Sequence, residues 1–267
     1  MLGAIAGDII GSVYEFNPIK TKNFVFFDDK CEFTDDTVLT VAIANSILTK
    51  TPYLQNIKKL GTGYPDSGYG NNFRKWLFSD ASEPYNSYGN GSAMRVSPIA
   101  YAFESKSQVL DEAEKSAEIT HNHPEGIKGA QATALAIYMA RTGSDKDSIK
   151  KTIVEKFGYE LNRTVDEIRP EYAFNETSQG SVPESIIAFL DSNSWDDAIR
   201  NAVSLGGDSD TMACIAGGIA EAYYKDIPSN VLKEVKDALD EDLWNKSVQF
   251  YLKHGIENIK DKIKKIM

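Results

Sequence analysis

Apolar residues recur at helical spacing along most of this sequence, and this periodicity is the feature that most constrains its fold. Three segments, TVLTVAIANSIL, EGIKGAQATALAIYMA and TMACIAGGIAEAYY, are apolar over most of their helical surface, so each must be buried among other helices. The only run typical of a β-strand is NFVFF at 23–27. The sequence therefore predicts an all-α protein.

Gly-, Asn- and Ser-rich turns separate the periodic segments and set the expected helix boundaries. The best-marked loops are 61–70, 87–92 and 175–182. No linker rich in Pro, Gly or Ser divides the chain, so we predict a single compact multi-helix domain over residues 1–267. The predicted helices cover 2–16, 36–50, 70–79, 92–104, 108–120, 124–142, 146–158, 183–191, 195–204, 210–225 and 230–253.

Charge and cysteine usage narrow the partners and the compartment. The net charge is −10, from 39 acidic against 29 basic residues, which argues against a nucleic-acid backbone or an anionic membrane as the main partner. The two cysteines, Cys31 and Cys214, exclude a disulfide scaffold and a thiolate zinc site, and fit a reducing cytosol. The apolar N-terminal segment is interrupted by Asp8 and begins without a basic region, so it predicts neither a signal peptide nor a membrane span. We expect a cytoplasmic protein.

Two acidic clusters, FTDDT around Asp35 and Asp36 and GGDSDT around Asp208 and Asp210, each precede a strongly apolar helix. Helix capping is one explanation, because Ser, Thr and Asp bind first-turn N–H groups. A cap needs only one side-chain oxygen, however, and each cluster offers at least three. Buried carboxylates without partners would have to protonate or bind cations, so metal binding is the second explanation.

A stripe of small residues runs along the first predicted helix, where Gly3, Gly7 and Gly11 recur every four residues and Glu15 continues the series. The glycines predict close packing of a neighbouring helix. Glu15 adds a carboxylate at the end of the stripe. If Glu15 joins the four clustered aspartates, two divalent ions reduce five negative charges to −1, whereas one ion leaves −3. Oxygen ligands in such number favour Mg²⁺, Mn²⁺ or Ca²⁺ over zinc or copper.

Two further segments have polar loop character. The run from Gly89 to Arg95 lies at a loop-to-helix junction, where backbone N–H groups can hold an anion, although an ordinary turn has the same composition. It lacks the GK[S/T] of a P-loop ATPase. The run HNHP contains His121 and precedes a helix, as either a surface turn or a ligand-facing loop. With three histidines in the chain, a His-rich metal site is not expected.

Taken in order, GAIAGDIIGSVYE, FTDDT, SYGNGSAMR, THNHPEG and LGGDSDT resemble the ADP-ribosylglycohydrolase family, which includes the dinitrogenase reductase-activating glycohydrolases. The resemblance runs from about residue 2 to about 225, and residues 226–267 show no motif. It implies an all-α fold with two Mg²⁺ or Mn²⁺ ions at its centre.

Site residues follow from the matched motifs. The resemblance implies that Glu15 lies close to the metals and the substrate, and we take it as the first candidate for a general acid or base; a metal-bound water relayed through Asp36 is the second. The implied metal ligands are Thr34, Asp35, Asp36, Asp208, Asp210 and Thr211, and the implied ADP-ribose contacts are Gly89, Asn90, Gly91, Ser92, Met94 and His121.

The activity implied is hydrolysis of the glycosidic bond between ADP-ribose and an acceptor, which reverses ADP-ribosylation. The partners would be an ADP-ribosylated protein or other ADP-ribosylated group and ADP-ribose itself, with nucleic acid only as a modified substrate, and we expect a monomer. The acceptor linkage stays open. The alternatives are an inactive ADP-ribose-binding module and, more remotely, a magnesium-dependent terpenoid-synthase-type enzyme, although the DDxxD of such enzymes is broken by Leu39 and Thr40.

Overall fold

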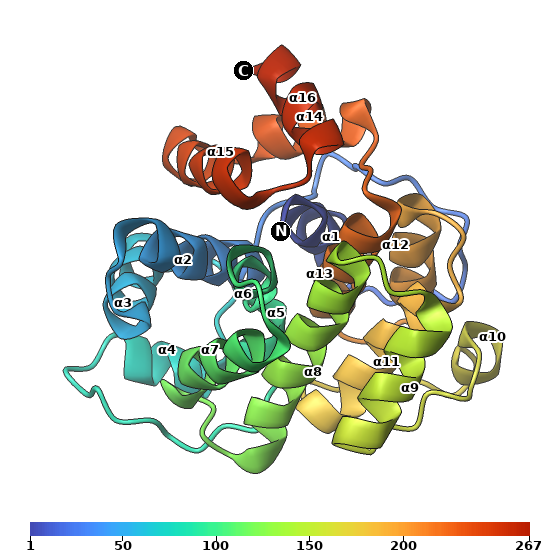
Figure 1. Cartoon of the computed structure of the whole chain (residues 1–267), viewed down its shortest axis with the longest axis horizontal. Helices are drawn as coiled ribbons and strands as arrows, with labels where there is room; N and C mark the ends of the chain where they lie inside the picture. Colours follow the sequence, from blue (N-terminus) through green and yellow to red (C-terminus); the bar gives the residue numbers. More distant parts are fainter.

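The computed structural model describes residues 1–267 and confirms an all-α fold with no β-strand (Figure 1). One isolated antiparallel bridge joins Gly89 to Thr177. The helices are α1 (Leu2–Ser12), α2 (Asp35–Thr49), α3 (Tyr53–Gly63), α4 (Asn71–Leu77), α5 (Gly91–Met94), α6 (Ser97–Ala102), α7 (Lys106–Glu118), α8 (Pro124–Arg141), α9 (Lys146–Phe157), α10 (Val165–Ile168), α11 (Ser178–Leu190), α12 (Trp195–Ser204), α13 (Ser209–Tyr224), α14 (Ser229–Ala238), α15 (Glu241–His254) and α16 (Glu257–Ile266).

The centre of the fold is the pair α1 and α13, which pack along each other (Figure 1). The predicted glycine stripe lies in this contact. A methyl carbon placed on Gly7 would lie 2.2 Å from the carbonyl oxygen of Ala213, and one placed on Gly11 would lie 2.4 Å from that of Ser209. Only glycine allows this approach, so the close packing predicted from the stripe is confirmed.

The remaining helices surround this pair and enclose one hydrophobic core of 74 buried residues. Helices α8, α11 and α12 pack against α13, while α2 packs against α3, α6 and α15. The C-terminal helices α14–α16 lie together at one end of the molecule (Figure 1). No helix combines the length and the apolar character needed to cross a membrane.

The first predicted helix, 2–16, is too long. Helix α1 ends at Ser12, and the chain turns through residues 13–17. Pro18 follows directly, and the residue before a proline is biased away from helical geometry. Tyr14 instead packs edge-on against Phe24, with the ring centroids 5.0 Å apart. Glu15 therefore lies beyond the helix and not on its glycine face.

Two predicted helices are each divided in two. The 92–104 segment forms α5 and α6, because Pro98 begins a new helix. The 230–253 segment forms α14 and α15, because the Asp240 side chain caps α15 by accepting a hydrogen bond from the Leu243 N–H at 2.9 Å. Both breaks come from local proline or capping chemistry inside an otherwise helical pattern.

Helix α11 begins before its predicted start at residue 183, inside the predicted loop 175–182. The Thr177 hydroxyl caps it by accepting a hydrogen bond from the Gly180 N–H at 3.2 Å, and Pro183 lies within the helix. Helices α3, α10 and α16 were not predicted, because α3 is weakly apolar, α10 has only four residues and α16 is rich in charged residues.

Candidate functional site

Asp8 lies on α1 in the buried centre of the protein, fully removed from solvent. Its carboxylate accepts hydrogen bonds from the backbone N–H groups of Thr34 and Thr37, each at 3.0 Å, and from both hydroxyls. Burial raises the pKa of Asp8 to about 6, although these four hydrogen bonds favour the charged form. Asp8 therefore holds the start of α2 against α1. It was not among the predicted site residues; its only signal is a carboxylate in an apolar helix.

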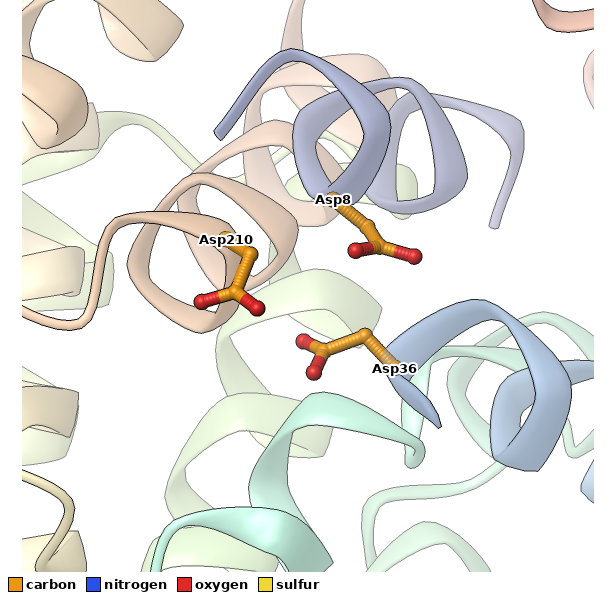
Figure 2. A group of neighbouring side chains, drawn as sticks. All are labelled: Asp8, Asp36 and Asp210. Atoms are coloured by element: carbon orange, nitrogen blue, oxygen red, sulfur yellow. The ribbon is translucent and has the colours of Figure 1, made fainter. Parts of the chain in front are cut away.

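Asp8, Asp36 and Asp210 converge from α1, α2 and α13, with their carboxylates turned toward one another (Figure 2). One oxygen atom from each lies within 4.8 Å of the other two. Oδ2 of Asp36 accepts a hydrogen bond from the Thr211 hydroxyl at 3.1 Å, while Oδ1 is buried without a partner. Burial raises the pKa values of Asp36 and Asp210 well above the ordinary range, and the next cause is the charge of Asp210 for Asp36 and that of Asp208 for Asp210.

A second group of carboxylates contains Glu15, Asp208 and Asp210, again with oxygen atoms within 4.8 Å of one another. Asp210 belongs to both groups. The Asn90 amide donates a hydrogen bond to Oδ2 of Asp208 at 2.7 Å. Burial and then the charge of Asp210 raise the pKa of Glu15 to about 8. Glu15 thus reaches the centre although it lies outside α1.

Helix capping does not account for the carboxylates of Asp36 and Asp208. At the start of α2 the cap is Thr34, whose hydroxyl accepts a hydrogen bond from the Asp36 N–H at 3.3 Å. At the start of α13 the side chain of Asp208 makes no capping hydrogen bond. Asp36 and Asp208 therefore direct their carboxylates toward the centre, where like charges meet in a buried environment.

Asp35 is half-buried and stands apart from both groups of three carboxylates. Its side chain faces the same open space, near Gly68. Burial and the charge of Asp210 also raise the pKa of Asp35 well above its usual value. The donor atoms of the centre are all oxygens, and Oδ1 of Asp36 has no hydrogen-bond partner. Such a set fits hard divalent cations, which would satisfy that oxygen and offset the repulsion.

A cleft of about 670 Å³ opens above these carboxylates, within the range of small-molecule sites. Glu15 and all six of the predicted metal ligands line it, as do Gly89, Asn90, Gly91, Met94 and His121. Ser92 does not, because its side chain is buried and its hydroxyl donates a hydrogen bond to the Gly126 carbonyl at 2.8 Å.

The loop before α5 is fixed to the start of α11 by two backbone hydrogen bonds of 2.9 Å. The Asn90 N–H donates to the Glu176 carbonyl, and the Ser178 N–H donates to that of Tyr88. This pairing gives the Gly-rich loop a defined shape along one wall of the cleft. Tyr85, Tyr88 and Phe174 also line the cleft and were not predicted, although two of them stand beside the Gly-rich run.

The two histidines in the turn after α7 have different roles. His123 caps α8 by accepting a hydrogen bond from the Glu125 N–H at 3.1 Å, whereas His121 is buried and lines the cleft. Burial and then the charge of Arg95 lower the pKa of His121 well below its usual value, so the ring is neutral. His121 therefore lies at the cleft, where a ligand would meet it, and not in a surface turn.

Comparison with known proteins shows which class has this all-α fold and acidic cleft. A solved structure described as "ADP-ribosylglycohydrolase-related protein complex" covers 94% of this chain and 96% of its own length, with a TM-score of 0.70 and 24% identity, and shows the same fold. The sequence model of the family described as ADP-ribosylglycohydrolase matches residues 1–259. This chain belongs to the ADP-ribosylglycohydrolase family.

Curated relatives carry matching names. The ADP-ribosylhydrolase ARH3 of Bos taurus is 29% identical over 84% of this chain and 83% of its own length, and the protein of that name in Homo sapiens is 29% identical over 84% of each. The ADP-ribosylarginine hydrolase Tri1 of Pseudomonas putida is 26% identical over 84% of this chain and 69% of its own. The predicted resemblance is confirmed, the chain is an ADP-ribosylglycohydrolase, and the terpenoid-synthase alternative has no support.

Proposed function

We propose that this enzyme hydrolyses the glycosidic bond between ADP-ribose and its acceptor with divalent cations held in the acidic centre. The observation that carries the proposal is the pair of carboxylate groups that share Asp210 on the floor of a polar cleft. Neither Asp36 nor Asp208 caps a helix, and each group has carboxylates that line the cleft, where a ligand would meet them.

The two groups would each hold one cation, Mg²⁺ or Mn²⁺, with Asp210 between them. One site would use Asp8 and Asp36, and the other would use Asp208, with Glu15 close beside it and free to transfer protons. Thr34, Asp35 and Thr211 line the cleft beside these groups and complete the predicted ligand set. When bound, such cations supply Lewis-acid chemistry, because they neutralise the carboxylates and polarise the oxygen atoms of a ligand.

Glu15 is the first candidate for proton transfer. Its carboxyl group lies at the cleft, and in the cation-free protein burial and the charge of Asp210 raise its pKa to about 8, so that it can carry a proton near neutral pH. Such a group can protonate a leaving acceptor and then take a proton from water. Glycosidic cleavage also passes through an oxocarbenium-like state, which the neighbouring carboxylates stabilise. Asp36 is the second candidate, because it lines the cleft where it could relay a proton from the attacking water.

The ADP-ribose would lie along the wall formed by Gly89, Asn90 and Gly91, with its pyrophosphate on the backbone of this loop. Met94 and His121 would contact it from the same side. The backbone pairing with residues 176–178 keeps the loop in place before the ligand arrives, which reduces the ordering cost of binding.

The acceptor is the finer question, since the name of the Pseudomonas putida relative specifies arginine and the names of the ARH3 proteins specify no acceptor. The test is a panel of ADP-ribosyl-arginine, ADP-ribosyl-serine, poly-ADP-ribose and ADP-ribosylated nucleic acid, each assayed with Mg²⁺ and with Mn²⁺. We expect release of ADP-ribose from at least one substrate by wild type and by Asp111→Asn, an exposed site remote from the cleft, but not by Asp210→Asn. Tight binding of free ADP-ribose without turnover of any substrate would instead identify an inactive binding module.

A further inference from the structure

Arg95 is a fully buried arginine that forms no ion pair. Its Nη2 group donates hydrogen bonds to the Ser116 carbonyl at 2.8 Å and to the Thr120 hydroxyl at 3.0 Å, while its Nε and Nη1 groups have no partner. Burial lowers the pKa of Arg95 only to about 10, so the guanidinium remains charged at neutral pH. A buried cation without a counter-ion is costly, and the mechanism proposed above does not use it.

The Thr120 hydroxyl connects Arg95 to the cleft. Oγ1 of Thr120 lies 2.7 Å from Nδ1 of His121 and is fully buried. The guanidinium can only donate, so Oγ1 must accept from Arg95. The hydroxyl keeps one hydrogen of its own, and Nδ1 of His121 is the one acceptor within its reach.

The direction of this second hydrogen bond determines the tautomer of His121. If Nδ1 carried the hydrogen, the Thr120 hydroxyl would have to accept twice, and its own hydrogen would be buried without a partner. If Nδ1 is unprotonated, the Thr120 hydroxyl accepts from Arg95 and donates to Nδ1, so both of its hydrogen bonds are made and the ring hydrogen lies on Nε2. Protonation of both nitrogens is disfavoured by burial and by the charge of Arg95.

Nε2 of His121 faces the Gly-rich loop. It lies 3.2 Å from the position of a methyl carbon placed on Gly91 and 3.6 Å from one placed on Gly89. The ring therefore presents Nε2 at the wall of the cleft where the proposed function places the pyrophosphate.

We propose that Arg95 and Thr120 are positioning residues that fix His121 as the Nε2–H tautomer, so that a neutral ring presents a hydrogen-bond donor to an oxygen of the bound ADP-ribose. The ring then binds an anionic ligand without taking up a proton. The ligand part of this inference rests on the proposed function, whereas the tautomer does not.

The tautomer can be measured directly, because the protein has only three histidines. Long-range ¹H–¹⁵N correlation spectra of histidine-labelled protein at pH 7.5 distinguish a protonated from an unprotonated ring nitrogen, and His123→Gln and His254→Gln assign the signals. We expect His121 to show protonated Nε2 and unprotonated Nδ1 in wild type. Thr120→Val, which keeps the side-chain shape without the hydroxyl, should add a population protonated at Nδ1, and Thr120→Ser should restore the wild-type pattern.

Ligand affinity provides the second readout. Calorimetric titration with free ADP-ribose should show a dissociation constant raised about 5- to 10-fold in Thr120→Val and close to wild type in Thr120→Ser. A wild-type ring protonated at Nδ1, or an unchanged tautomer and affinity in Thr120→Val, would overturn the inference. If Thr120→Val does not fold, the wild-type spectrum alone decides the tautomer. Absence of ADP-ribose binding by wild type would count against the proposed function and against the ligand role of His121, and would leave the tautomer result standing.

Discussion

Removing cations from the acidic centre should destabilise this enzyme in a way that depends on pH. Burial raises the folded-state pKa values of Asp8 and Asp208 from 3.8 to about 6, so the folded protein favours their protonated forms. The stability contributed by each proton is fully present below the unfolded pKa near 4. It is lost as the pH rises through 6.

The size of the effect follows from these shifts. A shift of about two pKa units corresponds to roughly 3 kcal/mol per group, and about half of it falls between pH 5 and pH 8. Deprotonation of both carboxyl groups would therefore lower the free energy of unfolding of the cation-free protein by roughly 3 kcal/mol between pH 5 and pH 8. For a chain of this length, that is a fall of roughly 6–12 °C in melting temperature.

Other groups also titrate between pH 5 and pH 8, so the informative quantity is the rise in melting temperature on adding Mg²⁺ to EDTA-treated protein at each pH. Protons compete with the cation for the carboxylates, so this rise should be small at pH 5 and larger at pH 8. Asp210→Asn removes the carboxylate common to both groups and should abolish most of the rise. Asp111→Asn makes the same chemical change on an exposed helix position and should behave as wild type.

The reasoning would be refuted by Mg²⁺ shifting wild type and Asp210→Asn equally, or neither, at pH 8. A rise of the same size at pH 5 and pH 8 would show that the buried carboxylates do not exchange protons for the cation.

Three further measurements test other parts of the structure. Hydrolysis should cease on chelation with EDTA and return with Mg²⁺ or Mn²⁺ but not with Zn²⁺, because the ligands are hard oxygens; full turnover in excess EDTA would contradict a cation-dependent mechanism. Glu15→Gln should lower kcat by ~10²-fold or more while free ADP-ribose still binds, and wild-type kcat in this variant would remove Glu15 from the chemistry. Gly7→Ala should cost roughly 1–3 kcal/mol in urea denaturation, because its methyl group would meet the Ala213 carbonyl, whereas Gly63→Ala, with open space around it, should not destabilise the protein.

The sequence patterns predicted those features of the fold that depend on residues close together in the sequence. The helix that follows Asp36 and the helix that follows Asp210 begin within one residue of their predicted starts, because apolar periodicity and an acidic first turn act locally. The role of Asp8 was missed, because it depends on hydrogen bonds to residues 26 and 29 positions away. Glu15 was expected on a helix face, but it reaches the centre from a turn. The path of this turn depends on the packing of Tyr14 against Phe24.

The glycine stripe and the acidic centre are two aspects of one contact. Gly7 and Gly11 let α1 approach the backbone of α13 so closely that no side chain fits between them. Asp8 follows Gly7 directly, and the added methyl carbon on Gly11 would lie 2.5 Å from the Cα of Asp210, so this approach brings the carboxylates of both helices together. A wider spacing between the helices would reduce the repulsion, but it would also separate the oxygen atoms that would hold the proposed cations. Under the proposed mechanism, the small residues therefore serve the chemistry of the site as well as the packing of the core.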